Sequence, residues 1–122
     1  MARIGIITGV LREAACLSAL ADDHQLMVRV AGADPRRATE LAAELVTAGV
    51  DGLMSFGLCG GLDPNLEAGD IILPSKIIAA EGRSISCDAD WTGHLQSGLG
   101  PLVVNAEGII AHSAVIVAGP RR

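Results

Sequence analysis

Aromatic residues are nearly missing from this sequence, and positive charge is nowhere concentrated. Phe56 and Trp91 are the only aromatic residues among 122, and the formal net charge is -5. Binding of single-stranded nucleic acid uses aromatic stacking platforms in a basic groove, and binding to a duplex relies on cations set against phosphates. The sequence therefore argues against a nucleic-acid partner.

Cysteine is sparse, and no long apolar run is present. Cys16, Cys59 and Cys87 are an odd number with wide spacing, without a CxxC motif, which is typical of free thiols in a reducing compartment. His94 and His112 have no neighbours at metal-ligand spacing, so we expect no metal site. No apolar run is long enough to cross a bilayer, and no cleavage-site pattern follows the N-terminus. We expect a mildly acidic, cytoplasmic protein with no transmembrane segment.

Hydrophobic residues make up 50% of the chain, which indicates a core-forming sequence and one domain over residues 1–122. Apolar runs predict seven strands, at residues 3–8, 26–31, 50–56, 70–74, 77–80, 101–104 and 113–118. Helical spacing of apolar residues predicts three helices, at residues 11–20, 35–48 and 88–98. This alternation predicts an α/β fold with a mixed, mainly parallel sheet flanked by helices in three layers.

The clearest helix start is Asp34-Pro35, with Asp as the N-cap and Pro in the first helical position. Gly32 precedes it, and a strand, a glycine and a helix N-terminus together can also hold an anion. Arg36 and Arg37 could add charge there, but we interpret them as solvated surface residues. Gly49 suits the position just after the helix.

Glu13 falls in the first turn of the predicted helix at residues 11–20. A carboxylate at that position is favoured by the helix dipole, which is a structural reason for its presence. A capping or dipole role is the more common one for a Glu at a helix start, and it is our interpretation of Glu13 from the residues alone.

The stretch around which the chain is organised is Ser55-Phe56-Gly57-Leu58-Cys59-Gly60-Gly61-Leu62-Asp63-Pro64. An apolar segment runs into this glycine-dense turn, and Gly69-Asp70-Ile71-Ile72 follows shortly after. Open α/β sheets place their binding crevice at such turns, at the carboxyl ends of strands. We therefore expect a ligand to bind there.

Four segments, in order, resemble the nucleoside phosphorylase and nucleosidase superfamily. Ile4-Gly5-Ile6-Ile7 with Glu13 resembles its first strand and acidic residue, and Ala31-Gly32-Ala33-Asp34 resembles its second glycine loop. Phe56-Gly57-Leu58-Cys59-Gly60-Gly61-Leu62 resembles its glycine turn, and Leu66-Glu67-Ala68-Gly69-Asp70-Ile71-Ile72 resembles the strand behind it. The form of the glycine turn is most similar to the hopanoid-associated branch, which is thought to remove adenine from adenosylhopane.

The resemblance implies cleavage of the N-ribosidic bond of a purine, adenosyl-type nucleoside, by water or by phosphate. Glu13 would be the catalytic carboxylate. Binding of substrate or phosphate would involve Gly9, Gly32, Gly57, Leu58, Cys59, Gly60 and Gly61. Inorganic phosphate would be a co-substrate, with no other cofactor and no metal, and the protein would be a homo-oligomer.

The sequence departs from the family pattern in two respects. Leu58 stands where classical members carry Ser, and the chain has no Met-Glu pair for the ribose and no late Ser-Asp motif for the base. We therefore expect an N-terminal portion of the family fold, truncated before those residues, with weak catalysis or none. A non-catalytic nucleoside-binding or interaction module is the alternative. A Rossmann cofactor domain is disfavoured, because no GxGxxG follows the first strand.

Overall fold

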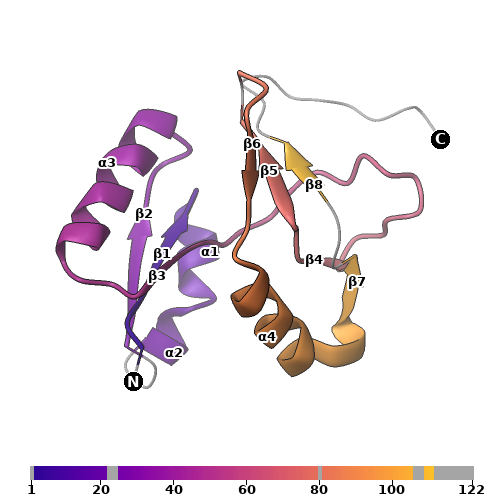
Figure 1. Ribbon diagram of the computed structural model, residues 1–122, viewed down its shortest axis with the longest axis horizontal. Coiled ribbons are helices and arrows are strands. Elements are labelled where there is room, and N and C mark those ends of the chain that lie inside the picture. Colours follow the sequence, from indigo (N-terminus) through magenta and orange to yellow (C-terminus); the bar gives the residue numbers. More distant parts are fainter. Residues whose placement is uncertain (1, 22–24, 80, 106–108, 112–122) are drawn as a thin grey trace. The chain divides into compact units, whose positions relative to one another are not determined.

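A computed structural model of the chain describes residues 2–21, 25–79, 81–105 and 109–111. The chain forms two compact units, Met1–Cys59 and Gly60–Arg122 (Figure 1). The expectation of a single domain over residues 1–122 stays a prediction.

The first unit is built on a three-stranded parallel sheet. Its elements are β1 (Ile4–Thr8), α1 (Leu11–Ala15), α2 (Ser18–Ala21), β2 (Leu26–Val30), α3 (Pro35–Thr47) and β3 (Gly52–Ser55). The strand order is β2-β1-β3, and Ile4 of β1 pairs with Leu26 on one side and Gly52 on the other. The strands predicted at residues 3–8, 26–31 and 50–56 are confirmed with small shifts at their ends.

Helices cover both faces of this sheet, as the sequence predicts. In Figure 1 the sheet is seen nearly edge-on, with α3 on one side and α1 and α2 on the other. This arrangement follows from the strand order, because the β1-to-β2 and β2-to-β3 crossovers run in opposite directions along the sheet. Two right-handed crossovers that run in opposite directions place their helices on opposite faces. On the α3 side, a Cβ added to Gly5 would lie 3.0 Å from Leu45 and 3.0 Å from Leu53, so the small residue lets helix and sheet approach. Among the described residues of the unit, the buried ones are Gly5, Ile6, Thr8, Leu17, Ala31, Leu41 and Leu45.

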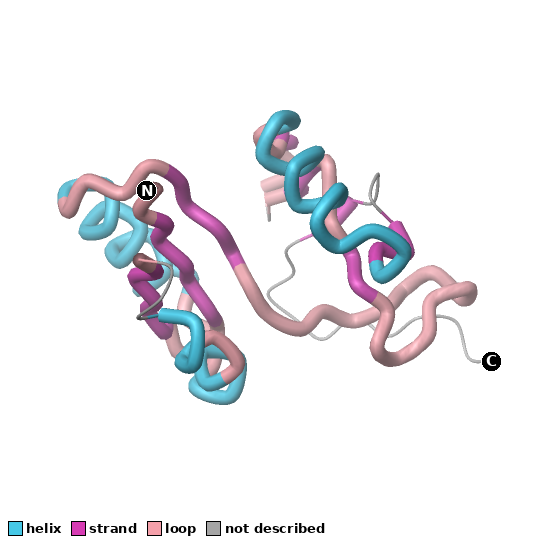
Figure 2. Tube along the Cα trace, turned by 90° about the horizontal axis from the view of Figure 1, so that it is seen from below, coloured by secondary structure: helices cyan, strands magenta, loops and turns pink. Residues whose placement is uncertain are grey.

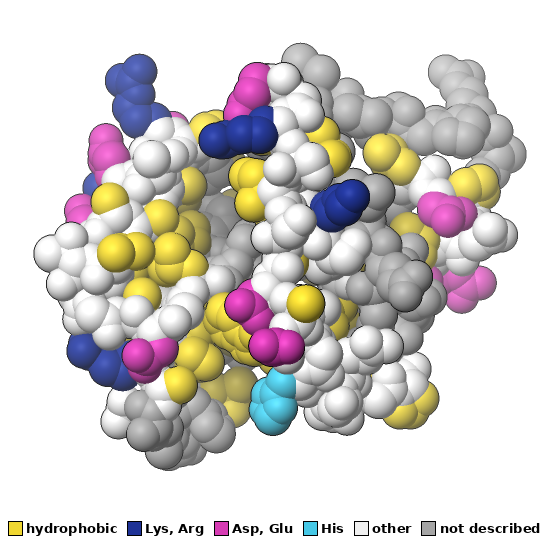
Figure 3. All heavy atoms as spheres, in the orientation of Figure 1, with side chains coloured by type: hydrophobic (Ala, Val, Ile, Leu, Met, Phe, Trp, Pro, Cys, Tyr) yellow, Lys and Arg dark blue, Asp and Glu magenta, His cyan; other side chains and the backbone are white. Residues whose placement is uncertain are grey.

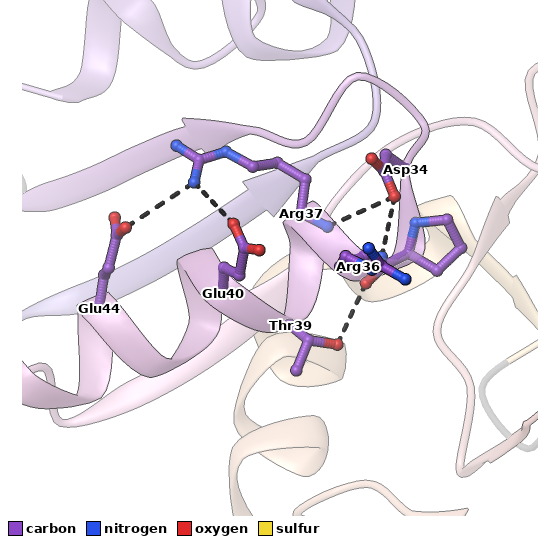
Figure 4. Close-up of polar contacts among 7 residues, drawn as sticks. Asp34, Arg36, Arg37, Thr39, Glu40 and Glu44 are labelled. Carbon is purple, nitrogen blue, oxygen red and sulfur yellow. Dashed lines mark hydrogen bonds and ion pairs between the residues drawn. The ribbon is translucent and has the colours of Figure 1, made fainter.

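Helix α3 begins as the sequence predicts. The Asp34 carboxylate accepts hydrogen bonds from the backbone N–H groups of Arg36 (2.9 Å) and Arg37 (3.5 Å), and Pro35 is the first helical residue (Figure 4). The Arg37 guanidinium points along the helix to Glu40 (3.1 Å) and Glu44 (3.8 Å). These exposed ion pairs contribute little to stability, so the cap is the stronger of the two features.

The helix predicted at residues 11–20 is divided into α1 and α2, so that prediction is wrong in its middle. At the break, the N–H groups of Cys16 and Leu17 donate to carbonyl groups only three residues earlier. The Ser18 hydroxyl also donates to the Ala15 carbonyl oxygen at 2.9 Å. Serine side chains compete for backbone groups in this way, and the chain tightens into a turn there.

The second unit contains shorter elements. These are β4 (Ile71–Ile72), β5 (Lys76–Ile78), β6 (Ser84–Ser86), α4 (Ala89–Leu99), the 3-10 turn η1 (Gly100–Leu102), β7 (Val103–Asn105) and β8 (Ile109–Ala111). Strand β4 pairs with β7 in parallel, and β5 pairs antiparallel with β6 and parallel with β8. Helix α4, the long cyan helix of this unit in Figure 2, starts at the predicted place, where the Asp88 carboxylate accepts the Trp91 N–H at 2.8 Å.

Sequence reasoning missed β6 and β8. Strand β6 is Ser84-Ile85-Ser86 with all three residues exposed, so it lacks a buried apolar run. The strand predicted at residues 113–118 lies outside the described residues. No helix in the described part of the chain is long and apolar enough to span a bilayer.

Candidate functional site

Two loops of the first unit meet at the carboxyl ends of neighbouring parallel strands. Gly9 and Val10 follow β1, and Phe56 to Leu58 follow β3. In the order β2-β1-β3, the connection from β1 to β2 runs in one direction along the sheet, and the connection from β2 to β3 runs back past β1. The strand order therefore reverses between β1 and β3, which border a topological switch point. Open α/β sheets bind ligands outside the carboxyl ends of strands at this kind of position.

Glu13 joins the two loops. Its Oε1 accepts the backbone N–H groups of Gly9 (2.8 Å) and Val10 (3.1 Å), and its Oε2 accepts the backbone N–H of Leu58 (2.6 Å). Val10 is the N-cap of α1 and its side chain has no acceptor, so the Glu13 carboxylate alone caps this end of the helix. Glu13 thus has the helix-start role suggested by its position, and one oxygen extends to a loop 45 residues away.

Gly57 provides the space for this carboxylate. A Cβ added at Gly57 would lie 2.6 Å from Glu13 Cδ and 2.9 Å from Oε1, and would be closer still to Oε2. Gly57 does not adopt a left-handed backbone conformation. The local backbone therefore does not require a glycine here, and a side chain at position 57 would instead displace the Glu13 carboxyl group.

The three amides hold Glu13 in its ionised form. The Leu58 N–H is the main cause that lowers the pKa of Glu13 below the ordinary 4.5, and the Val10 and Gly9 N–H groups act in the same direction. Partial desolvation opposes them and raises the pKa. A carboxylate has about four acceptor positions, so one position remains open on Oε2. The group can accept a hydrogen bond from a bound water or hydroxyl.

A hollow of about 360 Å3 lies beside Glu13. Val10, Phe56 and Leu58 give it apolar walls, and Glu13 and Arg12 supply its two charges. Small-molecule sites start at about 300 Å3 and combine apolar walls with a few polar groups. The hollow lies near the lower end of this size range, and its lining is mainly apolar.

Thr8 and the Gly32 loop support the β1 loop. The hydroxyl of Thr8, which is buried, lies 3.3 Å from the Val10 carbonyl oxygen and donates to it. The Ala33 N–H donates to the Gly9 carbonyl oxygen at 2.9 Å. Gly32 itself is left-handed, with φ +67°, and a Cβ there would meet nothing within 4 Å. The Gly32 loop therefore supports the β1 loop through a backbone hydrogen bond and not through a side chain.

The strand–Gly32–helix pattern suggests an anion site at the start of α3, but the structure makes this position less suited to bind an anion. Asp34 already accepts the Arg36 and Arg37 N–H groups, and Arg37 is paired with Glu40 and Glu44. An incoming phosphate would meet the Asp34 carboxylate at the helix end.

Of the candidate site residues predicted from the sequence, the structure brings four close together, which are Gly9, Glu13, Gly57 and Leu58. Cys59 is exposed at the end of the first unit. Gly60 and Gly61 belong to the second unit, where an added Cβ would meet nothing at Gly60 and would lie 3.4 Å from Leu66 at Gly61.

Val10, Arg12 and Thr8 belong to the site but were not singled out from the sequence. Their nearness to Gly9 and Glu13 is the only sequence signal that could have found them. Within the described ranges, no group of three or more acidic, His or Cys side chains is placed to hold a metal ion.

The first unit, with a carboxylate anchored at a switch point of a parallel sheet, has the architecture of an α/β small-molecule-binding enzyme domain. A family model described as the phosphorylase superfamily matches residues 30–104, and the chain belongs to this superfamily. At the level of the family, this points to a nucleoside phosphorylase type of enzyme and to cleavage of a nucleoside ribosidic bond. The matched stretch contains the Gly32 loop and the whole glycine turn, and Glu13 precedes it.

Neither the curated proteins nor the solved structures contain a significant match to this chain.

Proposed function

We propose that this protein cleaves the N-ribosidic bond of a purine nucleoside, with Glu13 as the carboxylate that orients the attacking nucleophile. The observation that carries the proposal is the anchoring of Glu13 by three amides at the switch point, beside the hollow. The position, the charge and the family membership support the same role.

The reaction sets the requirements for the site. As the bond breaks, the sugar gains oxocarbenium character, the base takes up a proton, and the nucleophile attacks the anomeric carbon, as in glycoside hydrolysis. The ionised Glu13 would align a water through the open position on Oε2, take its proton as the bond to carbon forms, and stabilise positive charge on the sugar. The Glu13 carboxylate would repel a phosphate and the Arg12 guanidinium would attract it, so water and phosphate both stay candidate nucleophiles.

For the substrate of this protein, we propose an adenosyl-type nucleoside with an apolar substituent. Adenosylhopane is such a nucleoside, and the resemblance to the hopanoid-associated branch makes it the specific candidate. The form of the glycine turn supports this choice, and so do the apolar walls from Val10, Phe56 and Leu58. Exposed apolar side chains, several of them visible as yellow spheres in Figure 3, support the expectation of a homo-oligomer.

A second candidate is a module that binds a nucleoside without cleaving it. The same three amide bonds favour this alternative, because a carboxylate with a lowered pKa is a weaker base. In that case Glu13 would organise the two loops and would not take part in chemistry.

Release of adenine tests the proposal. The full chain is incubated with adenosyl-type nucleosides, with and without phosphate and at several protein concentrations, and the free base is followed over time. Glu13→Gln should lower release by about 100-fold, at the low end for loss of a general base. Glu44→Gln, a change on the exposed face of α3, is the matched control and should leave the rate unchanged.

Nucleoside binding is measured on the same proteins by calorimetry. Binding that survives in Glu13→Gln while release is lost supports the catalytic role. Binding without release by the unmodified chain would establish the second candidate and reject the first.

A further inference from the structure

We infer that Gly57 is a positioning residue for Glu13: its missing side chain leaves the space in which the carboxylate meets the amides of both loops. The contact itself is independent of turnover. Its consequence for catalysis rests on the proposed function.

The steric argument is specific to one neighbour. The three nearest atoms to a Cβ added at Gly57 all belong to the Glu13 carboxyl group, with Cδ at 2.6 Å and Oε1 at 2.9 Å. Real Cβ atoms essentially never come within 3.0 Å of another atom, so a side chain at position 57 would force the carboxyl group to shift. The backbone of Gly57 lies outside the left-handed region, so alanine could adopt its conformation. The Glu13 carboxyl group is the nearest obstacle to a side chain at this position.

The carboxylate cannot move aside without losing its partners. Oε1 is held by the Gly9 and Val10 N–H groups and Oε2 by the Leu58 N–H. A swing of the side chain that makes room for a methyl group at position 57 would break one or both sets of bonds. Gly57→Ala should therefore release Glu13 from the β3 loop, the β1 loop or both.

A cycle of variants tests this coupling in the full chain. Urea unfolding is measured for the unmodified chain, Gly57→Ala, Glu13→Ala and the double variant. We expect Gly57→Ala to lower the urea midpoint when Glu13 is present and not to lower it in the Glu13→Ala background. Equal losses in both backgrounds would overturn the inference, because the obstacle would then be something other than the carboxylate.

Gly60→Ala is the matched control for an added methyl group in the same turn. A Cβ there meets nothing within 4 Å, and Gly60 is not left-handed. Its urea midpoint should not fall in either background. If Gly57→Ala alone fails to fold, the double variant decides: recovery of folding supports the inference and continued failure rejects it.

Nuclear magnetic resonance provides a readout that a general loss of stability would not produce. The Glu13 carboxyl carbon is titrated with pH and assigned by its disappearance in Glu13→Ala, and the Leu58 amide is followed in parallel. In the unmodified chain both signals should report the same transition. In Gly57→Ala the Glu13 transition should move to higher pH and the Leu58 amide should stop following it. An unchanged titration of both signals would overturn the inference.

Adenine release then connects the contact to chemistry. If the unmodified chain is active, Gly57→Ala should reduce release by about 100-fold, as expected for displacement of a general base. If the chain is inactive throughout, the proposed function fails, and the titration and the urea cycle still decide the role of Gly57.

Discussion

The two units of this chain differ in how deeply their residues are buried. Every described residue that is fully buried lies in the first unit, in its strands, in the turn after α1, just after β2 or in α3. In the second unit, the described side chains reach only partial burial. The first unit therefore has a packed core of its own, whereas the described part of the second unit contains short strands and one α-helix without a fully buried residue.

The deeper burial in the first unit favours this unit as the support for the candidate site. Groups for binding or chemistry need support from side chains fixed by packing. Glu13, Gly9, Gly57 and Leu58 are held by a sheet whose central strand is covered on both faces. The described part of the second unit offers no comparable frame to the glycines at its start, because regions with few buried contacts open more readily.

The largest effect should come from removing core volume in the first unit. Leu45 of α3 is 1% exposed and packs over Gly5, whereas its neighbour Val46 is 61% exposed. We expect Leu45→Ala to cost about 2–5 kcal/mol of unfolding free energy, and Val46→Ala to cost less than about 0.5 kcal/mol. Urea unfolding measures both. A similar loss from the two variants would contradict the core assigned to this unit.

Stabilisation of the second unit should reduce the difference between the units. Gly93 is an exposed interior residue of α4, and a Cβ there meets nothing within 4 Å. Gly93→Ala should stabilise this helix by about 0.5–1 kcal/mol. The same change at Gly82, where φ is +86°, should destabilise the unit, because alanine is strained in the left-handed region. Amide hydrogen exchange of α4 and β5 reports both effects, and equal signs would contradict this account.

The smallest effect should be a dependence on acid in the first unit. The pKa of Glu13 is lower in the folded chain than in the unfolded chain, chiefly through the Leu58 N–H. Its stabilising contribution is therefore complete above about pH 4.5 and disappears as the pH falls through the folded pKa. Glu13→Gln should remove this part of the acid dependence, and Glu44→Gln should not. Unfolding midpoints measured between pH 6 and pH 3 test this, and parallel curves for all three proteins would count against it.

The sequence predicted the frame of the first unit because its signals are local. The strands were visible as short apolar runs, and α3 was visible from Asp34-Pro35 and its apolar spacing. The break between α1 and α2 was missed, since it depends on a Ser18 hydroxyl that competes for a backbone carbonyl. In the second unit, β6 was missed because its residues are exposed and carry no apolar pattern.

The candidate site was only partly visible for a different reason. Glu13 and the glycine turn could be singled out separately, one from its place in a helix and the other from its glycine density. Their meeting depends on the strand order β2-β1-β3, which brings together residues 45 positions apart. The space at Gly57 has no signature in a sequence, because the atom that would clash is the one that glycine lacks. The catalytic and binding roles of these residues stay predictions.

The hydrogen bond to Leu58 has a consequence for the chemical freedom of that position. The group that Glu13 grips is the main-chain N–H, while the Leu58 side chain is 93% exposed and takes no part in the bond. Nineteen of the twenty standard amino acids can supply this donor, and proline alone cannot. Position 58 can therefore carry a hydroxymethyl or an isobutyl side chain while the carboxylate keeps its anchor.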